Sequence, residues 1–479
     1  MSAAPDLKLG LRRESRRVVE AASLPLRSQG KRLEAASTTE PEIRAVLKCI
    51  VSPTNDPARH AAGGGTSLKL GLQSDTGVSP VSGGAPPTGE TPVPLWNPAR
   101  QTDGSYFPDD EPRLAALLDG FLASLSEDLA RHPFSSEVCI LLLAGGYGRG
   151  EGGVFQANEP AEPQLYNDLE FYLILRDGAS AGPADQWCAA QAHRGDELLG
   201  IEVEFKILRE GEFRAAEPSM FYYDLLAAHR VVFGPADFAS TIRAELRDPA
   251  LIPLHEATRL LFNRGTGLFF SSVALHRNDA RVANGFIERN HAKVKLALAD
   301  AVLACAGRYH FSCRERDRRM REKQPGMSVP PDWETLAAWH AEGVEFKLHP
   351  RHRHPSISEM QATHDELRRV WIRTFLWLET LRLGTPFHSA ADYAGYAGRL
   401  YPRTNALRNC ALHWRDRLKR GAALPTLFDY PRAPLQRALV LLLQAEPDFD
   451  GACKALGLTP PCSLDALAEA YERWWRYYN

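Results

Sequence analysis

The sequence predicts an α+β fold in which a small mixed sheet is followed by an all-helical region. Short apolar runs rich in branched side chains occur at 137–144, 169–175 and 201–208, as in strands of a sheet. A stretch with the character of a helix, 185–199, separates the second run from the third. Beyond about residue 250, strand patterns become scarce and helical periodicity dominates. This order of elements is typical of an α+β protein.

These patterns divide the chain into three predicted parts: 1–104, 105–245 and 246–479. The middle part opens with an amphipathic helix at 111–131 and contains the three strands. In the last part we expect helices at 254–275, 283–306, 331–343, 357–382, 403–418, 432–446 and 463–477.

Residues 1–104 have the composition of a disordered or low-complexity tail. They are rich in Ser, Gly, Pro, Thr and Ala and show no long periodicity. The pentapeptide Leu-Lys-Leu-Gly-Leu occurs at 7–11 and again at 68–72. Two interpretations remain open: a flexible tail, or translated repeat DNA upstream of a later true start.

The overall composition is that of an ordinary soluble protein. Hydrophobic residues make up 44% and charged residues 24%, with a formal net charge of -2. This charge does not indicate a nucleic-acid partner, although one remains possible. No run of 18 apolar residues occurs, so we expect no membrane partner. None of the eight cysteines forms a Cys-x-x-Cys pair, which favours reduced thiols and a cytoplasmic location.

A glycine-rich segment follows the first predicted strand directly. It reads Gly-Gly-Tyr-Gly-Arg-Gly-Glu-Gly-Gly from Gly145 to Gly153. Successive glycines allow a backbone to approach a ligand closely, and a turn of this kind can bind phosphate. Arg149 could pair with phosphate oxygens. The segment is not a Walker loop, because no Gly-Lys-Ser/Thr follows. A glycine-rich surface turn is the alternative.

Carboxylates occur in pairs on the next two predicted strands. Asp168 and Glu170 are two residues apart and therefore share a face, as do Glu202 and Glu204. Clustered carboxylates repel one another unless a cation lies between them, and oxygen ligands suit Mg²⁺. The alternative is that each pair forms the solvent face of a half-exposed strand.

Together these features resemble the DNA polymerase beta-type nucleotidyltransferase superfamily. In that superfamily an apolar strand, a Gly-Gly or Gly-Ser pair and a turn precede Asp-x-Asp/Glu, and a third acid lies on a later strand. Here Gly145 and Gly146 match the glycine pair, and Asp168 and Glu170 match the paired metal ligands. Glu204 matches the third acid best, with Glu202 as the alternate. The resemblance covers mainly 137–208.

The resemblance implies metal-dependent transfer of a nucleoside monophosphate from a nucleoside triphosphate to an acceptor. Two Mg²⁺ or Mn²⁺ ions would be held by the acids, and Gly145, Gly146, Tyr147 and Arg149 would contact the triphosphate. The acceptor stays open between a small molecule such as an aminoglycoside-like antibiotic, an RNA such as a tRNA end, and a protein. Two other classes also remain: a catalytically weak nucleotide-binding or regulatory module, and a non-enzymatic helical interaction protein.

Several residues of the helical part are further candidates. Asn263-Arg264 place polar groups in an apolar helix and could face the nucleotide or form a buried ion pair. Lys293 could meet a phosphate, or pair with Asp300 on the same helix face. The basic run 314–323 is a solvated face or an RNA contact. The His-rich segment 349–354 reads as a basic loop rather than a metal site.

Overall fold

The computed structural model describes residues 105–156, 161–283, 285–323, 327–351, 355–420 and 427–478. The predicted tail, 1–104, lies outside this part of the chain. All described residues fall within one compact unit, so the boundary predicted at 245/246 stays a prediction.

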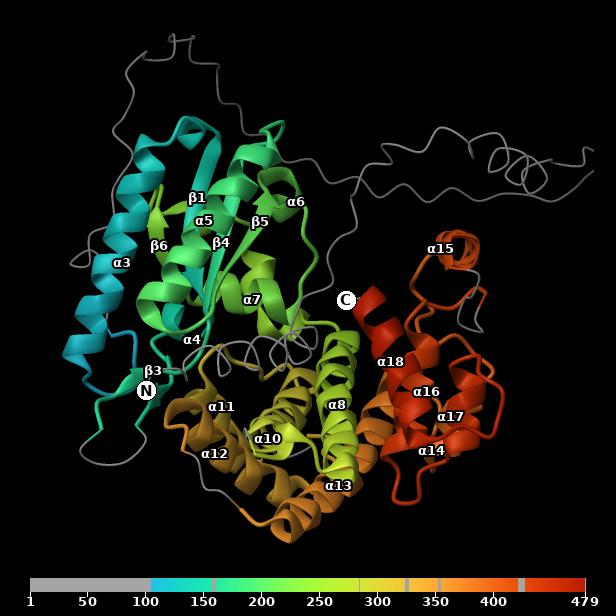
Figure 1. The fold of residues 1–479 in the computed structure, drawn as a ribbon. Helices are drawn as coiled ribbons and strands as arrows, with labels where there is room; N and C mark the ends of the chain where they lie inside the picture. Colours follow the sequence, from blue (N-terminus) through green and yellow to red (C-terminus); the bar gives the residue numbers. More distant parts are fainter. Residues whose placement is uncertain are drawn as a thin grey trace, which may run out of the picture. The chain divides into compact units, whose positions relative to one another are not determined.

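The first half of the described chain is built around a four-stranded mixed sheet (Figure 1). Its strands run in the order β5-β4-β1-β6. β1 is antiparallel to both β4 and β6, whereas β4 and β5 are parallel. Adjacent parallel strands need a crossover connection, and α5 supplies it. The elements are α3 (Pro112–Arg131), β1 (Val138–Ala144), α4 (Gly145–Gly148), β2 (Val154–Phe155), β3 (Gln164–Leu165), β4 (Leu169–Leu175), α5 (Ala181–Leu199), β5 (Val203–Arg209), α6 (Glu210–Arg214), α7 (Met220–Ala227) and β6 (Arg230–Phe233).

Helices cover both faces of this sheet. On one face, Leu143 and Phe171 belong to a core that includes Phe121 of α3 and Trp187 of α5. On the other, Ile140, Leu142, Tyr172 and Ile174 pack with Phe213 of α6 and Leu225 of α7. Because side chains alternate along a strand, odd positions of β4 enter the first core and even positions point to the second face.

The second half of the described chain contains helices and no strand. Its longest members are α8 (Leu254–Arg277), α10 (Phe286–Cys305) and α13 (Ile357–Leu383). The others are α9 (Ala280–Ala283), α11 (Cys313–Arg321), α12 (Trp333–Leu348), α14 (Ala390–Ala394), α15 (Ala406–Arg420), α16 (Ala433–Leu443), α17 (Phe449–Ala455) and α18 (Leu464–Tyr478). Within the described ranges, no helix is both long and apolar enough to span a bilayer.

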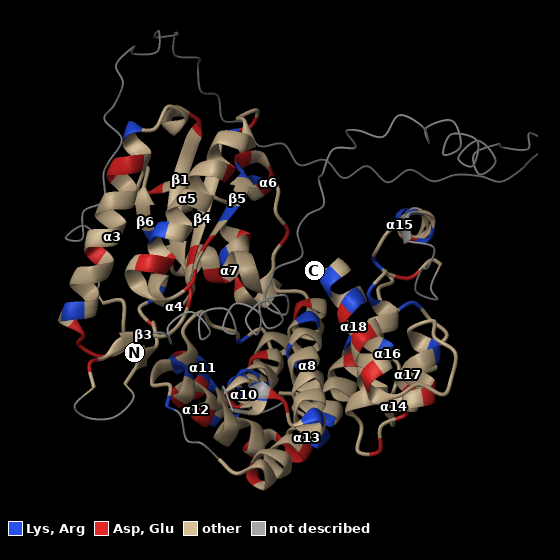
Figure 2. Ribbon diagram, in the orientation of Figure 1, with Lys and Arg blue, Asp and Glu red and all other residues tan. Residues whose placement is uncertain are grey.

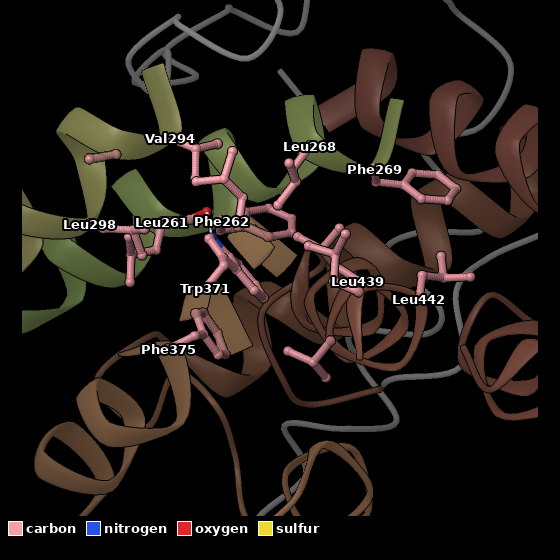
Figure 3. Packing of buried hydrophobic residues seen from close by; sticks show 14 of the residues in the cluster. Leu261, Phe262, Leu268, Phe269, Val294, Leu298, Trp371, Phe375, Leu439 and Leu442 are labelled. Atoms are coloured by element: carbon pink, nitrogen blue, oxygen red, sulfur yellow. Dashed lines mark hydrogen bonds between the residues drawn. The ribbon is translucent and has the colours of Figure 1, made fainter. Parts of the chain in front are cut away.

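Aromatic and branched side chains from α8, α10, α13 and α16 form the core of this half (Figure 3). Trp371 lies at its centre, fully buried and stacked on Phe375 at 4.8 Å between ring centroids. Its indole Nε1 donates a hydrogen bond of 3.1 Å to the carbonyl oxygen of Leu261. A buried indole with its donor satisfied fixes the packing of α13 against α8.

The α+β fold class is confirmed, as a small mixed sheet followed by many helices. The three predicted strands correspond to β1, β4 and β5. Three helices, α11, α14 and α17, were not predicted from the sequence. α14 and α17 are too short to show a periodic pattern, and α11 is dominated by charged residues.

Two cysteines differ from the expectation of reduced thiols. Cys453 and Cys462 are joined as a disulfide, with Cα atoms 6.3 Å apart. Cys453 lies on α17 and Cys462 just before α18. The turn between these two helices brings the cysteines together, and no Cys-x-x-Cys motif indicates it. The other described cysteines are free thiols: Cys139, Cys188, Cys305, Cys313 and Cys410.

Candidate functional site

The glycine segment forms a tight helical turn, α4, at the end of β1. Gly145 has φ +66°, a conformation that side-chain-bearing residues rarely adopt. A Cβ at Gly145 would lie 3.3 Å from Cδ of Glu170, and a Cβ at Gly146 would lie 3.0 Å from the carbonyl oxygen of Glu151. The turn therefore lies directly against the acid-bearing strand, which requires glycine at its first position.

Tyr147, a predicted nucleotide contact, turns its side chain into the protein core. Its ring is fully buried and meets Phe107 edge to face at 5.8 Å between centroids. Its hydroxyl donates to the carbonyl oxygen of Gly153 at 3.3 Å and accepts from the Tyr166 N–H at 3.1 Å. This geometry favours a packing role for the ring and leaves only the Tyr147 backbone for a ligand.

The paired carboxylates of the two parallel strands share one face of the sheet. Glu170 of β4 is in register with Glu204 of β5. Asp168 lies two residues before Glu170, and Glu202 two before Glu204, so alternation directs all four toward the same side. The intervening Leu169 and Val203 are buried in the opposite core, with α3 and α5.

The pKa of Glu170 reflects its burial and the charges of the neighbouring acids. Burial raises the pKa of its carboxyl above the ordinary value, and the neighbouring charge of Asp168 raises it further. Lys206 and Arg149 oppose the shift, and Glu204 adds to it. The acids are therefore close enough to repel one another, and protonation or a cation would relieve that repulsion.

The carboxylates do not form a ready-made metal cage. Among the described residues, no three His, Cys, Asp or Glu side chains are grouped to hold a metal ion. Glu204 is engaged by Lys206, whose Nζ lies 3.0 Å from Glu204 Oε2. The donor set of hard oxygens suits a divalent cation. The registered pairing with Glu170 favours Glu204 over Glu202 as the third acid.

Arg149 of the turn is held by acids of the protein itself. Its Nη1 donates to Asp224 Oδ2 of α7 at 3.2 Å, and its Nε lies 4.0 Å from Glu151 Oε2. Glu151 is 5% exposed and also accepts from Lys347 Nζ at 3.0 Å and from the Cys313 N–H at 2.8 Å. The position predicted for phosphate binding is thus part of a buried ionic network.

This network continues among side chains of the helical half. Tyr309 donates to Asp224 Oδ2 at 3.1 Å, and Arg316 Nε lies 2.6 Å from Asp300 Oδ1. Burial opposes a charge on His340, yet hydrogen bonds to Asp300 and Asp317 raise the pKa of its imidazole above the ordinary value. These contacts join residues far apart in the chain and were not predicted from the sequence. Asp300 pairs with Arg316 and His340, two partners that were not predicted from the sequence.

A cavity of about 370 Å³ borders this network. Arg149 and Lys293 are the predicted site residues in its lining, together with Asn263 and Arg264. Its described lining is strongly cationic, with seven Arg or Lys and three Asp or Glu side chains: Arg149, Arg259, Arg264, Arg289, Lys293, Arg316 and Lys347 against Asp224, Glu256 and Asp300. Lys and Arg also mark α10 and α11 in Figure 2.

Arg264 connects this cavity with the carboxylate cluster. Burial lowers the pKa of its guanidinium, and the charges of Asp300, Glu170 and Asp168 oppose that shift. Asn167, the residue before Asp168, lines the cavity as well. The four carboxylates of the strands are not themselves in the lining, and four of its cations pair with acids of the protein: Arg149, Arg259, Arg316 and Lys347.

Two other predicted features contain ion pairs within the protein. In the run 314–323, Arg318 pairs with Glu315 and Glu322, Arg319 with Glu315, and Arg321 with Asp317. These pairs favour the solvated face over an RNA contact. In the His-rich segment, His349 Nε2 lies 3.5 Å from Asp109 Oδ2, and 352–354 lie outside the described residues.

Comparisons of the chain with protein-family models, curated proteins and solved structures find no match.

Proposed function

We propose that the chain transfers a nucleoside monophosphate from a metal-bound nucleoside triphosphate to an acceptor. One observation carries the proposal: the lining of a cavity with seven cationic side chains includes Asn167, the residue before Asp168, and Arg264, on which the charges of Asp168 and Glu170 act. A triphosphate needs cations around its oxygens, and metal-dependent phosphoryl chemistry needs carboxylates next to them. The glycine turn and the spacing of the acids also resemble those of the DNA polymerase beta-type nucleotidyltransferase superfamily.

In this proposal Asp168 and Glu170 hold the metal, with Glu204 or Glu202 as the third acid. A bound Mg²⁺ or Mn²⁺ would neutralise triphosphate charge. Lys293 and Arg264 orient the triphosphate within the cavity, because their charges complement its oxygens. Gly145 allows the turn to lie against Glu170, and Arg149 holds the turn to Asp224. The third acid, once freed from Lys206, can accept a proton from an acceptor hydroxyl.

The second candidate is a nucleotide-binding or regulatory module with weak catalysis. The ion pair between Glu204 and Lys206 favours it, because a carboxylate bound to lysine is a poorer metal ligand. Lys206→Met separates the two candidates. If Glu204 is the third ligand, this variant should bind Mn²⁺ more tightly and transfer faster. A module that binds nucleotide without transfer would gain no activity.

The test is incubation of the full chain with labelled triphosphates and Mg²⁺ or Mn²⁺, together with cell extracts as the source of acceptors. Mass analysis should detect an added nucleoside monophosphate on a small molecule, an RNA or a protein. Direct titration with ATP and GTP gives a separate readout. Nucleotide binding without any transfer would favour the second candidate, and absence of both would refute the two together.

A further inference from the structure

Helix α15 turns apolar side chains outward, to solvent. Leu407, Trp414 and Leu418 are 68%, 49% and 76% exposed, and Ala411 between them is exposed too. Their spacing of i, i+4, i+7 and i+11 places all four along one face of the helix. This face is a continuous apolar stripe, defined here as the α15 stripe.

The inner side of α15 is polar, the reverse of an ordinary surface helix. Among the side chains of α15 that the structure describes, the buried ones are Asn409 and Asp416, at 4% and 0% exposure. Asn409 Nδ2 donates to the carbonyl oxygen of Phe428 at 3.2 Å. Asp416 accepts from the hydroxyls of Tyr477 and Tyr478 of α18, the latter at 2.8 Å. These bonds anchor the helix and keep the α15 stripe facing outward.

Two residues that follow α15 enlarge the exposed apolar surface. Leu427 and Phe428 are 38% and 51% exposed. The segment 407–428 thus contributes five of the ten large exposed apolar side chains among the described residues. Such a concentration marks an interaction surface, because scattered single residues are the usual pattern.

Arginines flank the α15 stripe on both sides. Arg408 and Arg417 are exposed, and helical geometry places them on opposite flanks of the stripe. Arg417 lies over the Trp414 ring at 5.7 Å from its centroid. A second copy of the chain would bring like charges together across this surface. The segment 1–104 carries more Lys and Arg than Asp and Glu, so it does not complement the flanks either.

We propose that α15 is a membrane-surface helix that docks the protein on an anionic lipid bilayer. Leu407, Trp414 and Leu418 would enter the boundary between headgroups and acyl chains, while the flanking arginines meet lipid phosphates. A helix lying in the bilayer surface needs no membrane span. The prediction of no membrane partner follows from the absence of an apolar run long enough to span a bilayer, and a helix on the bilayer surface contains no such run.

The experiment is co-sedimentation of the full chain with vesicles. Vesicles of phosphatidylcholine and phosphatidylserine in equal amounts should bind the protein, and vesicles of phosphatidylcholine alone should not. Leu407→Ser/Leu418→Ser should weaken binding by about tenfold or more, because two apolar anchors are lost. Arg408→Gln/Arg417→Gln should weaken binding and reduce its dependence on salt. Leu198→Ser/Leu381→Ser removes two exposed leucines of α5 and α13 and should bind like the parent.

Three results would overturn the proposal. One is parent protein that stays unbound on anionic vesicles at low salt. Another is binding that the α15 variants leave unchanged although they fold, as checked by circular dichroism. The third is a parent dimer in light scattering that Leu407→Ser/Leu418→Ser abolishes without affecting vesicle binding, which would assign the surface to a second copy. None of these measurements depends on the proposed transfer activity.

Discussion

Replacement of Gly145 by alanine tests whether the glycine turn controls the carboxylate cluster. Gly145 has φ +66°, and an alanine in this conformation costs about 1–2 kcal/mol of stability. Its Cβ would also lie 3.3 Å from both Cδ and Oε2 of Glu170, so the carboxylate would have to shift by a few tenths of an ångström. We therefore expect lower stability and about tenfold lower transfer, since catalytic groups tolerate little misplacement.

Gly200 provides a matched control. It has φ +68° at the end of α5, and a Cβ there would meet no heavy atom within 4 Å. Gly200→Ala should lose a similar amount of unfolding free energy in urea titrations but keep its ATP binding and transfer. If both alanine variants retain the parent transfer rate, or both lose it equally, the contact between Gly145 and Glu170 has no functional role.

Three further changes give distinct readouts. Asp168→Asn should reduce labelled monophosphate transfer by orders of magnitude while stability in urea holds or rises, because Glu170 loses a repelling charge; unchanged transfer would mean that the site is misassigned. Arg149→Met should destabilise the fold by about 1–3 kcal/mol, because the half-buried Asp224 loses its cation and keeps only the bond from Tyr309, and Asp224→Asn in the same chain should restore part of that loss; additive losses would contradict the pairing. Burial lowers the pKa of His364 to about 3, so the unfolded chain takes up a proton first as pH falls below 6.5, and stability falls from there toward pH 3. Between pH 6.5 and pH 5, the unfolding free energy of His364→Gln should fall by about 2 kcal/mol less than that of the parent. Equal falls in the two proteins would contradict this reasoning.

Much of the sheet could be predicted because β1 and β4 are short, nearly continuous apolar runs and β5 mostly alternates. Because successive side chains of a strand point to opposite faces, the sequence also predicts that Asp168 and Glu170 share a face. The registered pairing of Glu170 with Glu204 required the parallel order of β4 and β5, which local sequence does not specify. The bond between Glu151 and Lys347 joins residues 196 positions apart, and no local pattern reports such a contact.

For helix α15, the sequence pattern predicts the helix but not which of its faces is buried. Its periodicity predicted a helix at 403–418, close to the observed Ala406–Arg420. Periodicity identifies an apolar face but not whether that face points inward. The tyrosine hydroxyls of α18 make the polar side of α15 the buried one, and they lie about 60 residues further along the chain.

The ties between the glycine turn and the helical half bear on whether the two halves are interchangeable modules. Lys347 and the Cys313 backbone bond Glu151, and Tyr309 bonds Asp224 beside Arg149. A fragment ending near residue 245 would lose these partners and uncover Glu151, Asp224 and Arg149 to solvent. A chimera that joined the sheet to a foreign helical domain would cover the same charged groups without these partners. The two halves are therefore expected to evolve, and to be engineered, as one unit.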